Sequence, residues 1–123
     1  SQELQDAKAV LFQARAQRVL TKGLRQTVKV IESKKALLVF LASDCDEENY
    51  VKLVNALCRE QGVQIIMVPH KEQLAQWTGI VKGVEEPAED GEAKKIPKCS
   101  CAVISSPFLQ SVELARLKKQ YEN

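Results

Sequence analysis

Hydrophobic and polar residues follow two patterns along this chain, one typical of strands and one typical of helices. A continuous apolar run, rich in branched and aromatic residues, spans residues 37–42. Such a run suits a central strand that is covered on both faces. An acidic segment follows at 44–48, and apolar residues then recur at helical spacing from Tyr50 to Cys58. This stretch predicts a strand, a tight turn and an amphipathic helix against which the rest of the chain packs.

The same two patterns predict further elements on both sides, namely helices at about 4–18, 24–33 and 71–78, and strands at 63–68 and 99–104. Residues 19–21 either end the first helix or form a short β segment. A final helix is expected to begin at Pro107 and to pack through Phe108, Val112, Ala115 and Leu117. This order of elements indicates an α/β sheet with crossover connections. With 123 residues there is room for one core, so a single domain is expected over residues 1–123.

The acidic segment after the first strand is expected to cap the helix that follows it. Asp44 followed by Glu47 is a capping-box pattern, and Asp46 is a competing N-cap residue. Together with Glu48, these acids could also bind a divalent ion, but they lack the glycine and the spacing of a calcium loop. Helix capping is therefore the expected use.

Charge is distributed unevenly along the chain. Residues 1–40 carry a net charge of +5, residues 41–93 carry −7, and residues 94–123 carry +4. A polyanion could contact both ends of the chain if the fold brings them together, whereas three differently charged solvated faces are the alternative. No apolar run reaches the roughly 20 residues of a membrane span, and no secretory signal is visible at the start. No membrane partner is expected.

The helix expected at 24–33 carries a basic stripe opposite its apolar face. The stripe follows i, i+3, i+4 and i+7 spacing through Lys22, Arg25, Gln26 and Lys29. A basic stripe at a helix N-terminus can bind phosphate through side-chain charge, unpaired backbone N–H groups and the positive end of the helix dipole. Gly23 lacks a Cβ where a nucleic-acid backbone could approach. Taken alone, such a stripe is more often a solvated face.

Residues 82–98 break both patterns and predict a long acidic loop. Glycine and proline interrupt the segment, and five acidic residues lie between them. Loops of this length are often functional or disordered. The loop ends in a basic rim that consists of Lys94, Lys95 and Lys98.

Residue types that carry catalysis or bind metals form no recognisable constellation. The four cysteines, Cys45, Cys58, Cys99 and Cys101, lack zinc-site spacing and are expected to be reduced and mostly buried. His70 is the only histidine, and no candidate partner is apparent for it. Phosphate-binding, dinucleotide and nucleophile-elbow motifs are missing from the sequence. We therefore expect no enzyme activity, catalytic residue, metal, cofactor or small-molecule substrate.

The segment 41–58 is the most specific motif in the chain. It reads Leu-Ala-Ser-Asp-Cys-Asp-Glu-Glu-Asn-Tyr-Val-Lys-Leu-Val-Asn-Ala-Leu-Cys. Further matches follow in register at Gly23-Leu24-Arg25, Lys29, Lys71, Leu74, Trp77, Gly79 and Cys99-Ser100-Cys101. Over residues 20–104 the chain resembles a eukaryote-specific family of small-subunit ribosomal proteins. That family lies within the superfamily of kink-turn-binding proteins of ribosomes and small nucleolar ribonucleoproteins.

The resemblance implies a three-layer α/β/α sandwich with a four-stranded mixed sheet. It also implies a structural, non-catalytic constituent of the small ribosomal subunit, bound to ribosomal RNA at the beak of the head and next to other ribosomal proteins. The implied location is the cytoplasmic ribosome, with assembly in the nucleolus. The expected RNA surface comprises Lys22, Gly23, Arg25, Gln26 and Lys29, with weaker additions at Lys71, Lys94, Lys95 and Lys98.

The chain departs from the superfamily's kink-turn readers at two positions. Those proteins carry Gly-x-Asn-Glu at the start of the second helix and a Lys three residues later. Gly23 and Lys29 fit this pattern, but Arg25 stands in place of Asn and Gln26 in place of Glu. Arginine lacks an acceptor, although it pairs bidentately with phosphate or guanine. The alternatives are a nucleolar kink-turn binder, a protein-interaction adaptor that uses the acidic loop at 82–98 and, more distantly, a small α/β enzyme.

Overall fold

A mixed sheet forms the middle layer of the part of the chain that the structure describes, which is residues 2–79, 100–106 and 112–121 of a computed structural model. Its strands are β1 (Leu20–Lys22), β2 (Ala36–Ala42), β3 (Gln64–Val68) and β4 (Cys101–Ser105), in the spatial order β1-β4-β2-β3. β2 runs parallel to β3, and β4 runs antiparallel to β1 and β2. The inner strands β2 and β4 are almost entirely buried because both of their faces are covered.

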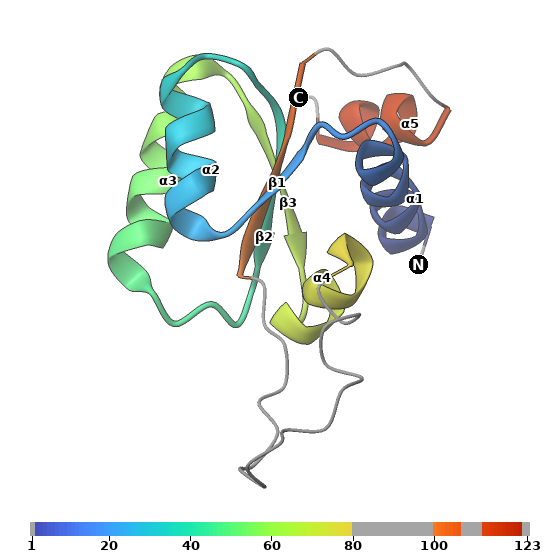
Figure 1. Cartoon of the computed structure of the whole chain (residues 1–123), viewed down its shortest axis with the longest axis horizontal. Coiled ribbons are helices and arrows are strands. Elements are labelled where there is room, and N and C mark those ends of the chain that lie inside the picture. The colour runs from blue at the N-terminus through green and yellow to red at the C-terminus, as the bar shows by residue number, and fades with distance from the viewer. Residues whose placement is uncertain (1, 80–99, 107–111, 122–123) are drawn as a thin grey trace, which may run out of the picture.

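Helices cover both faces of this sheet (Figure 1). The helices α1 (Gln2–Ala16), α4 (Lys71–Thr78) and α5 (Val112–Tyr121) lie on one face, and α2 (Leu24–Glu32) and α3 (Glu48–Gln61) lie on the other. The predicted three-layer α/β/α sandwich with a four-stranded mixed sheet is confirmed. Within the described residues, no helix combines the length and the apolar character that a membrane crossing requires.

Side chains that alternate along β2 divide the core into two clusters. Leu38 and Phe40 face the helices α1, α4 and α5, whereas Val39 and Leu41 face α2 and α3. All four are at most 1% exposed. Burying one such side chain contributes roughly 1.5–3 kcal/mol. The apolar run predicted as a central strand therefore holds both helical layers to the sheet.

The ends of several elements differ from the predicted ones. α1 ends at Ala16, and residues 19–21 overlap β1, so the β segment is the correct one of the two alternatives. β4 begins at Cys101, whereas the predicted strand begins at Cys99, which lies outside the described residues. The predicted acidic loop at 82–98 also lies outside them.

The last helix packs through residues other than most of those predicted. Leu114 and Leu117 are fully buried, whereas Val112 is 67% exposed and Ala115 is exposed. Of the predicted contacts only Leu117 is correct within this helix, and the predicted start at 107–108 lies outside the described residues. The buried pair is spaced i, i+3 and joins the same cluster as α1, so the docking of α5 on α1 selects this face.

An ion pair between a buried Asp6 and a half-exposed Arg116 joins α1 to α5. Asp6 is 1% exposed, and Arg116 donates to both of its carboxylate oxygens, from Nε at 3.0 Å and from Nη2 at 2.9 Å. Gln2 donates a third hydrogen bond to Asp6 at 3.0 Å. Because a buried carboxylate is costly without partners, this pair favours one alignment of the two helices. It brings together segments from the two ends of the chain.

The acids after β2 do not form the predicted capping box on α3. The N-cap residue of α3 is Glu47, and it makes no side-chain capping hydrogen bond. Asp44 instead accepts a hydrogen bond from the backbone N–H of Lys71, the first residue of α4, at 2.8 Å. β2 and β3 are parallel neighbours, with Ala42 paired to Val68, so the turns that follow them lie together. The cap therefore acts on a helix 27 residues further along the chain.

Candidate nucleic-acid interface

α2 begins where the edge strand β1 ends, at a glycine with an unusual backbone conformation. Gly23 has φ of 99° and ψ of 147°, a region that residues with a Cβ disfavour. Its N–H donates to the carbonyl of Cys101 at 2.9 Å, which fixes the start of α2 to the start of β4. A Cβ on Gly23 would meet no atom within 4 Å, so the space outside this turn is open.

The N-terminal end of α2 differs electrostatically from the other helix ends. Gly23 offers no side-chain cap, and the first turn of α2 contains no acidic residue. Each other helix that the structure describes has a glutamate in its first turn, namely Glu3, Glu48, Glu72 and Glu113. An acid in the first turn offsets the partial positive charge of the helix end. In α2 that charge is left without a neighbouring acid and is available to an anion.

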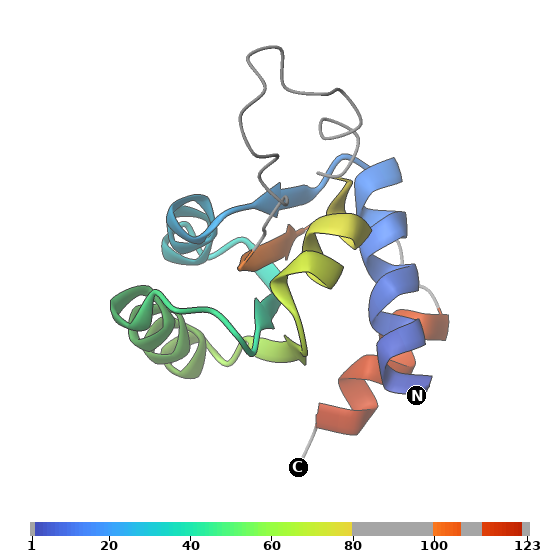
Figure 2. The ribbon, with the colours of Figure 1, turned by 90° about the horizontal axis from the view of Figure 1, so that it is seen from below.

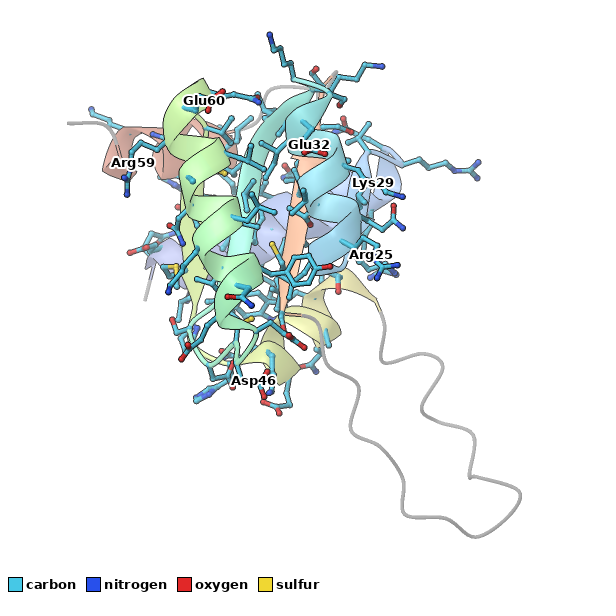
Figure 3. The ribbon with its side chains drawn as sticks, turned by 90° about the vertical axis from the view of Figure 1, so that its left-hand side faces the viewer. Arg25, Lys29, Glu32, Asp46, Arg59 and Glu60 are labelled. Carbon is cyan, nitrogen blue, oxygen red and sulfur yellow. The ribbon has the colours of Figure 1, made fainter. Side chains whose placement is uncertain are left out.

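Basic and polar side chains predicted to bind RNA lie at this end of α2 and along the helix flank that continues from it to Lys29 in the last turn. Lys22, Arg25, Gln26 and Lys29 are all exposed, while Val28 and the other core-facing residues of α2 are buried. Figure 3 shows Arg25 and Lys29 on the flank of α2 that faces away from α3. Among the described residues, none of the three cations has a carboxylate within salt-bridge distance. The structure thus brings Arg25, Gln26 and Lys29 together on the exposed side of α2, with Gly23 at its start. Lys22 ends β1 instead and borders a pocket on the other face of the sheet.

The weaker predicted additions are not part of this group. Lys71 begins α4, its side chain is 15% exposed, and its Nζ lies 4.0 Å from Asp46 Oδ2. Its charge is therefore already partnered within the chain. Lys94, Lys95 and Lys98 lie outside the described residues.

His70 has a neighbour that the sequence did not reveal. Its Nδ1 lies 3.9 Å from Asp44 Oδ2, because the turns after β2 and β3 meet. The prediction that His70 has no candidate partner is therefore wrong, because Asp44 is one. Ligand atoms of Asp44, His70 and Glu72 lie within 4.8 Å of one another, a spacing that could accommodate a metal ion, but all three residues are exposed. Asp44 already accepts the N–H of Lys71, so capping accounts for its position.

The cysteines behave as small apolar residues where they are described. Cys58 and Cys101 are buried thiols, and Cys45 is a half-buried one. Burial raises the pKa of Cys58 to about 11, so this thiol stays protonated near neutral pH. The prediction that the thiols are mostly buried is confirmed for these three residues.

Two basic residues that the sequence did not single out also lie near β1. Arg15 and Arg18 border a pocket together with Lys22 and Gly79. The spacing of the first helix showed only that the two arginines fall outside its apolar stripe. Their proximity to Gly79 depends on how α1 packs on α4, which no local pattern encodes.

Comparison with known proteins agrees with this fold. The model of the ribosomal protein L7Ae/L30e/S12e/Gadd45 family matches residues 5–104. Small ribosomal subunit protein eS12 of Hordeum vulgare is 43% identical over 102 residues, which are 83% of this chain and 68% of that protein. Small ribosomal subunit protein eS12z of Arabidopsis thaliana is 42% identical over 109 residues, which are 89% and 73% of the two chains.

A solved structure shares the architecture at much lower identity. The Giardia lamblia 15.5kD RNA binding protein aligns with a TM-score of 0.68 and 15% sequence identity, over 98% of this chain and 84% of that one. At this identity the likeness concerns the fold alone. The match to the family model covers most of the chain, and the two plant relatives exceed 40% identity. This chain therefore belongs to the ribosomal protein L7Ae/L30e/S12e/Gadd45 family.

Proposed function

We propose that this protein is a structural, non-catalytic constituent of the small ribosomal subunit and that it binds ribosomal RNA through the N-terminal end of α2. The observation that carries the proposal is α2 itself, which has no acid in its first turn and presents Arg25 and, further along the same flank, Lys29 to solvent. The names of the plant relatives, small ribosomal subunit proteins, support the assignment to that particle.

The chemistry of this surface favours contacts with the RNA backbone. Lysine and arginine bind phosphate oxygens, and the free N–H groups of the first turn of α2 add further donors. Gly23 leaves open space where a backbone could approach the turn. Such contacts position a protein on RNA, give it strongly salt-dependent affinity and carry little sequence information. The proposed surface comprises Lys22, Gly23, Arg25, Gln26 and Lys29, with Lys71, Lys94, Lys95 and Lys98 as weaker additions.

The proposed location is the beak of the small-subunit head, beside neighbouring ribosomal proteins, with assembly in the nucleolus before export to the cytoplasm. Of the alternatives, a kink-turn reader is less favoured because Arg25 and Gln26 replace the Asn and Glu of that pattern. An adaptor that acts through the loop at 82–98 stays an untested prediction, because the loop lies outside the described residues.

The test is a charge reversal on the exposed flank of α2 in the full chain. Arg25→Glu combined with Lys29→Glu should lower affinity for small-subunit ribosomal RNA fragments more than tenfold at about 0.1 M salt. The slope of log K against log salt should fall by roughly two, because two phosphate contacts are lost. Affinity is measured by filter binding or fluorescence anisotropy over a salt series.

A matched control separates this surface from net charge. Lys34 and Lys35 are exposed at the opposite end of α2, before β2 begins, and Lys34→Glu with Lys35→Glu changes the charge by the same amount. The control should bind as the parent does, apart from a small long-range effect. Equal losses in both variants would mean that only total charge matters. No loss in the α2 variant would remove the assignment of this surface.

A further inference from the structure

A second group of basic side chains lies on the face of the sheet opposite to α2. Arg15, Arg18 and Lys22 border an open pocket of about 310 Å³, which Leu20, Thr78 and Gly79 complete. Figure 2 shows the end of α1, the edge strand β1 and α4 coming together on this side of the sheet. The volume is at the small end of the range for ligand pockets, and Leu20 is the only bulky apolar residue among the six. The lining favours a small charged group over an apolar ligand.

The three cations have no counter-charge within the described chain. None of them has a described carboxylate within salt-bridge distance. No acidic residue is among the six that border the pocket. Like charges around one opening repel one another, and an anion placed between them removes that repulsion. The charge and the size of the pocket therefore suit a small anion.

Arg15 is held in position by contacts on two sides. Gly79 ends α4 with φ of +89°, and a Cβ there would lie 2.6 Å from Arg15 Cζ and 2.8 Å from Nε. The guanidinium can occupy this place only because Gly79 has no side chain. On another side, Arg15 Cζ lies 6.0 Å from the centre of the Phe12 ring, within the range of a cation–π contact. These contacts restrict the guanidinium before any ligand arrives.

Arg18 occupies a backbone position that usually takes glycine. The N–H of Arg18 donates to the carbonyl of Arg15 at 3.1 Å, and the N–H of Val19 donates to the carbonyl of Ala14 at 3.0 Å. This is the hydrogen-bond pattern of a Schellman motif, in which the residue with positive φ is most often glycine. Arg18 has φ of 61°, a conformation that a side chain disfavours. Because this position holds an arginine and not a glycine, the C-terminal end of α1 contributes a cationic side chain to the border of the pocket.

We propose that Arg15, Arg18 and Lys22 bind a backbone phosphate of the same RNA that contacts α2, an inference that rests on the proposed function. Lys22 precedes Gly23, the N-cap residue of α2, and β1 is an edge strand. The pocket and the basic flank of α2 thus lie on the two sides of β1. An RNA strand that crosses this edge contacts both groups. The interface then extends from α2 around β1 to the end of α1.

The experiment compares two neutralising double variants of the full chain. Arg15→Gln with Arg18→Gln removes the pocket charges, and Lys34→Gln with Lys35→Gln is the matched control at the other end of α2. With the tightest-binding fragment of small-subunit ribosomal RNA, the pocket variant should lose at least fivefold in affinity. Its salt slope should fall by roughly 1.5, since about two phosphate contacts are weakened. The control should keep the affinity and the salt slope of the parent.

A third variant, Arg25→Gln with Lys29→Gln, separates this inference from the proposed function. If only this α2 variant loses affinity, the pocket does not bind RNA and the inference is overturned while the proposed function stands. If neither the α2 variant nor the pocket variant loses affinity, both are overturned. Unfolding midpoints of all variants are measured alongside, so that a folding defect is not taken for a binding defect.

A measurement on the unmodified chain distinguishes an RNA phosphate from a free anion and needs no variant. The backbone amide signals of Arg18 and Gly79 are followed by NMR while the RNA fragment, AMP or inorganic phosphate is added. The inference expects a saturating shift with RNA and only a weak, non-saturating shift with millimolar AMP or phosphate. Saturation by AMP or phosphate without a response to RNA would overturn it, as would unchanged signals in the presence of RNA.

Discussion

The N-terminal ends of α2 and α4 lie at the same end of the sheet, yet the chain completes them in opposite ways. At α4, Asp44 accepts the first N–H at 2.8 Å, Glu72 lies in the first turn, and Lys71 contacts Asp46. At α2, Gly23 offers no side-chain cap, and no acid lies in the first turn. The same unpaired N–H groups are thus satisfied internally in one helix and left to solvent or a ligand in the other.

The difference shows that the unpaired N–H groups and partial positive charge of a helix N-terminus can either stabilise the fold or bind a ligand. A capped helix end contributes to the stability of the fold, and its charge is no longer available to a partner. An uncapped end gives up that stabilisation and retains the ability to bind an anion. The comparison also explains why Lys71 and Lys29, both predicted as RNA contacts, have different surroundings. Lys71 lies beside the acids that complete α4, whereas Lys29 faces solvent on α2.

The largest effect is expected from converting the start of α2 into a kink-turn reader. Arg25→Asn with Gln26→Glu creates the Gly-x-Asn-Glu pattern while Lys29 is retained. Affinity for an isolated kink-turn RNA should rise at least tenfold, because both new side chains supply acceptors for base edges and hydrogen bonds to the charged Glu contribute roughly 1.5–3 kcal/mol. Anisotropy titrations of parent and variant provide the measurement, with an unkinked duplex as control. Equal affinity would show that more than these two positions separates the chain from kink-turn readers.

A medium effect on stability is expected at the capped helix end. Asp44→Ala removes the acceptor for the N–H of Lys71 and should lower the free energy of unfolding by roughly 1 kcal/mol, or the melting temperature by roughly 3–5 °C. RNA affinity should remain that of the parent. Thermal unfolding followed by circular dichroism measures the first quantity. A loss of RNA affinity in this variant would contradict the separation of the two helix ends.

A smaller effect is expected when α2 receives the acid that the other helices already have. Gln26→Glu puts a carboxylate in the first turn of α2 and should stabilise the fold by about 0.3–1 kcal/mol through the helix dipole. The same carboxylate repels phosphate, so affinity for ribosomal RNA should fall severalfold. Chemical denaturation and RNA titration of one preparation test the two signs together. A variant that gains both stability and RNA affinity would show that the end of α2 does not contact phosphate.

The smallest effect is a pH dependence of stability that arises at the N-terminal end of α5, where Glu113 lies in the first turn. The pKa of Glu113 in α5 is lowered, first by the hydrogen bond from the Gln13 side chain at 3.1 Å and then by its own backbone N–H. A carboxyl group with a lowered pKa in the folded state stabilises the fold above its unfolded pKa. That contribution is lost as pH falls from the unfolded pKa through the lower folded pKa. Carboxyl NMR should show Glu113 titrating below its ordinary value.

Gln13→Ala provides the control for this titration. Without the amide donor the pKa of Glu113 should rise toward its ordinary value, and the small acid-sensitive part of the stability should disappear. An unchanged titration would assign the shift to the start of α5 alone. α2 has no acid in its first turn, so no such titration is expected there.

Most of the fold follows from local patterns in this sequence. The apolar run at 37–42 lies in β2, the helix at 71–78 has its predicted ends, and Arg25 and Lys29 of the basic stripe lie exposed on one flank of α2. Such features depend on residues within a few positions of one another, because strand and helix periods set which side chains share a face. The sequence alone grouped five of the predicted site residues in this way, namely Lys22, Gly23, Arg25, Gln26 and Lys29.

What the sequence by itself determined about this protein is the order of its elements, the buried faces of all of them except α5, and the basic start of α2. Only the tertiary structure decided that Asp44 caps α4, that His70 has an acidic neighbour and that Arg15 and Arg18 share a pocket with Lys22. The physical reason is the separation along the chain of the residues that interact. Helix and strand periods act between near neighbours in the chain, whereas these contacts join segments that meet only when parallel strands pair and helices pack across the sheet.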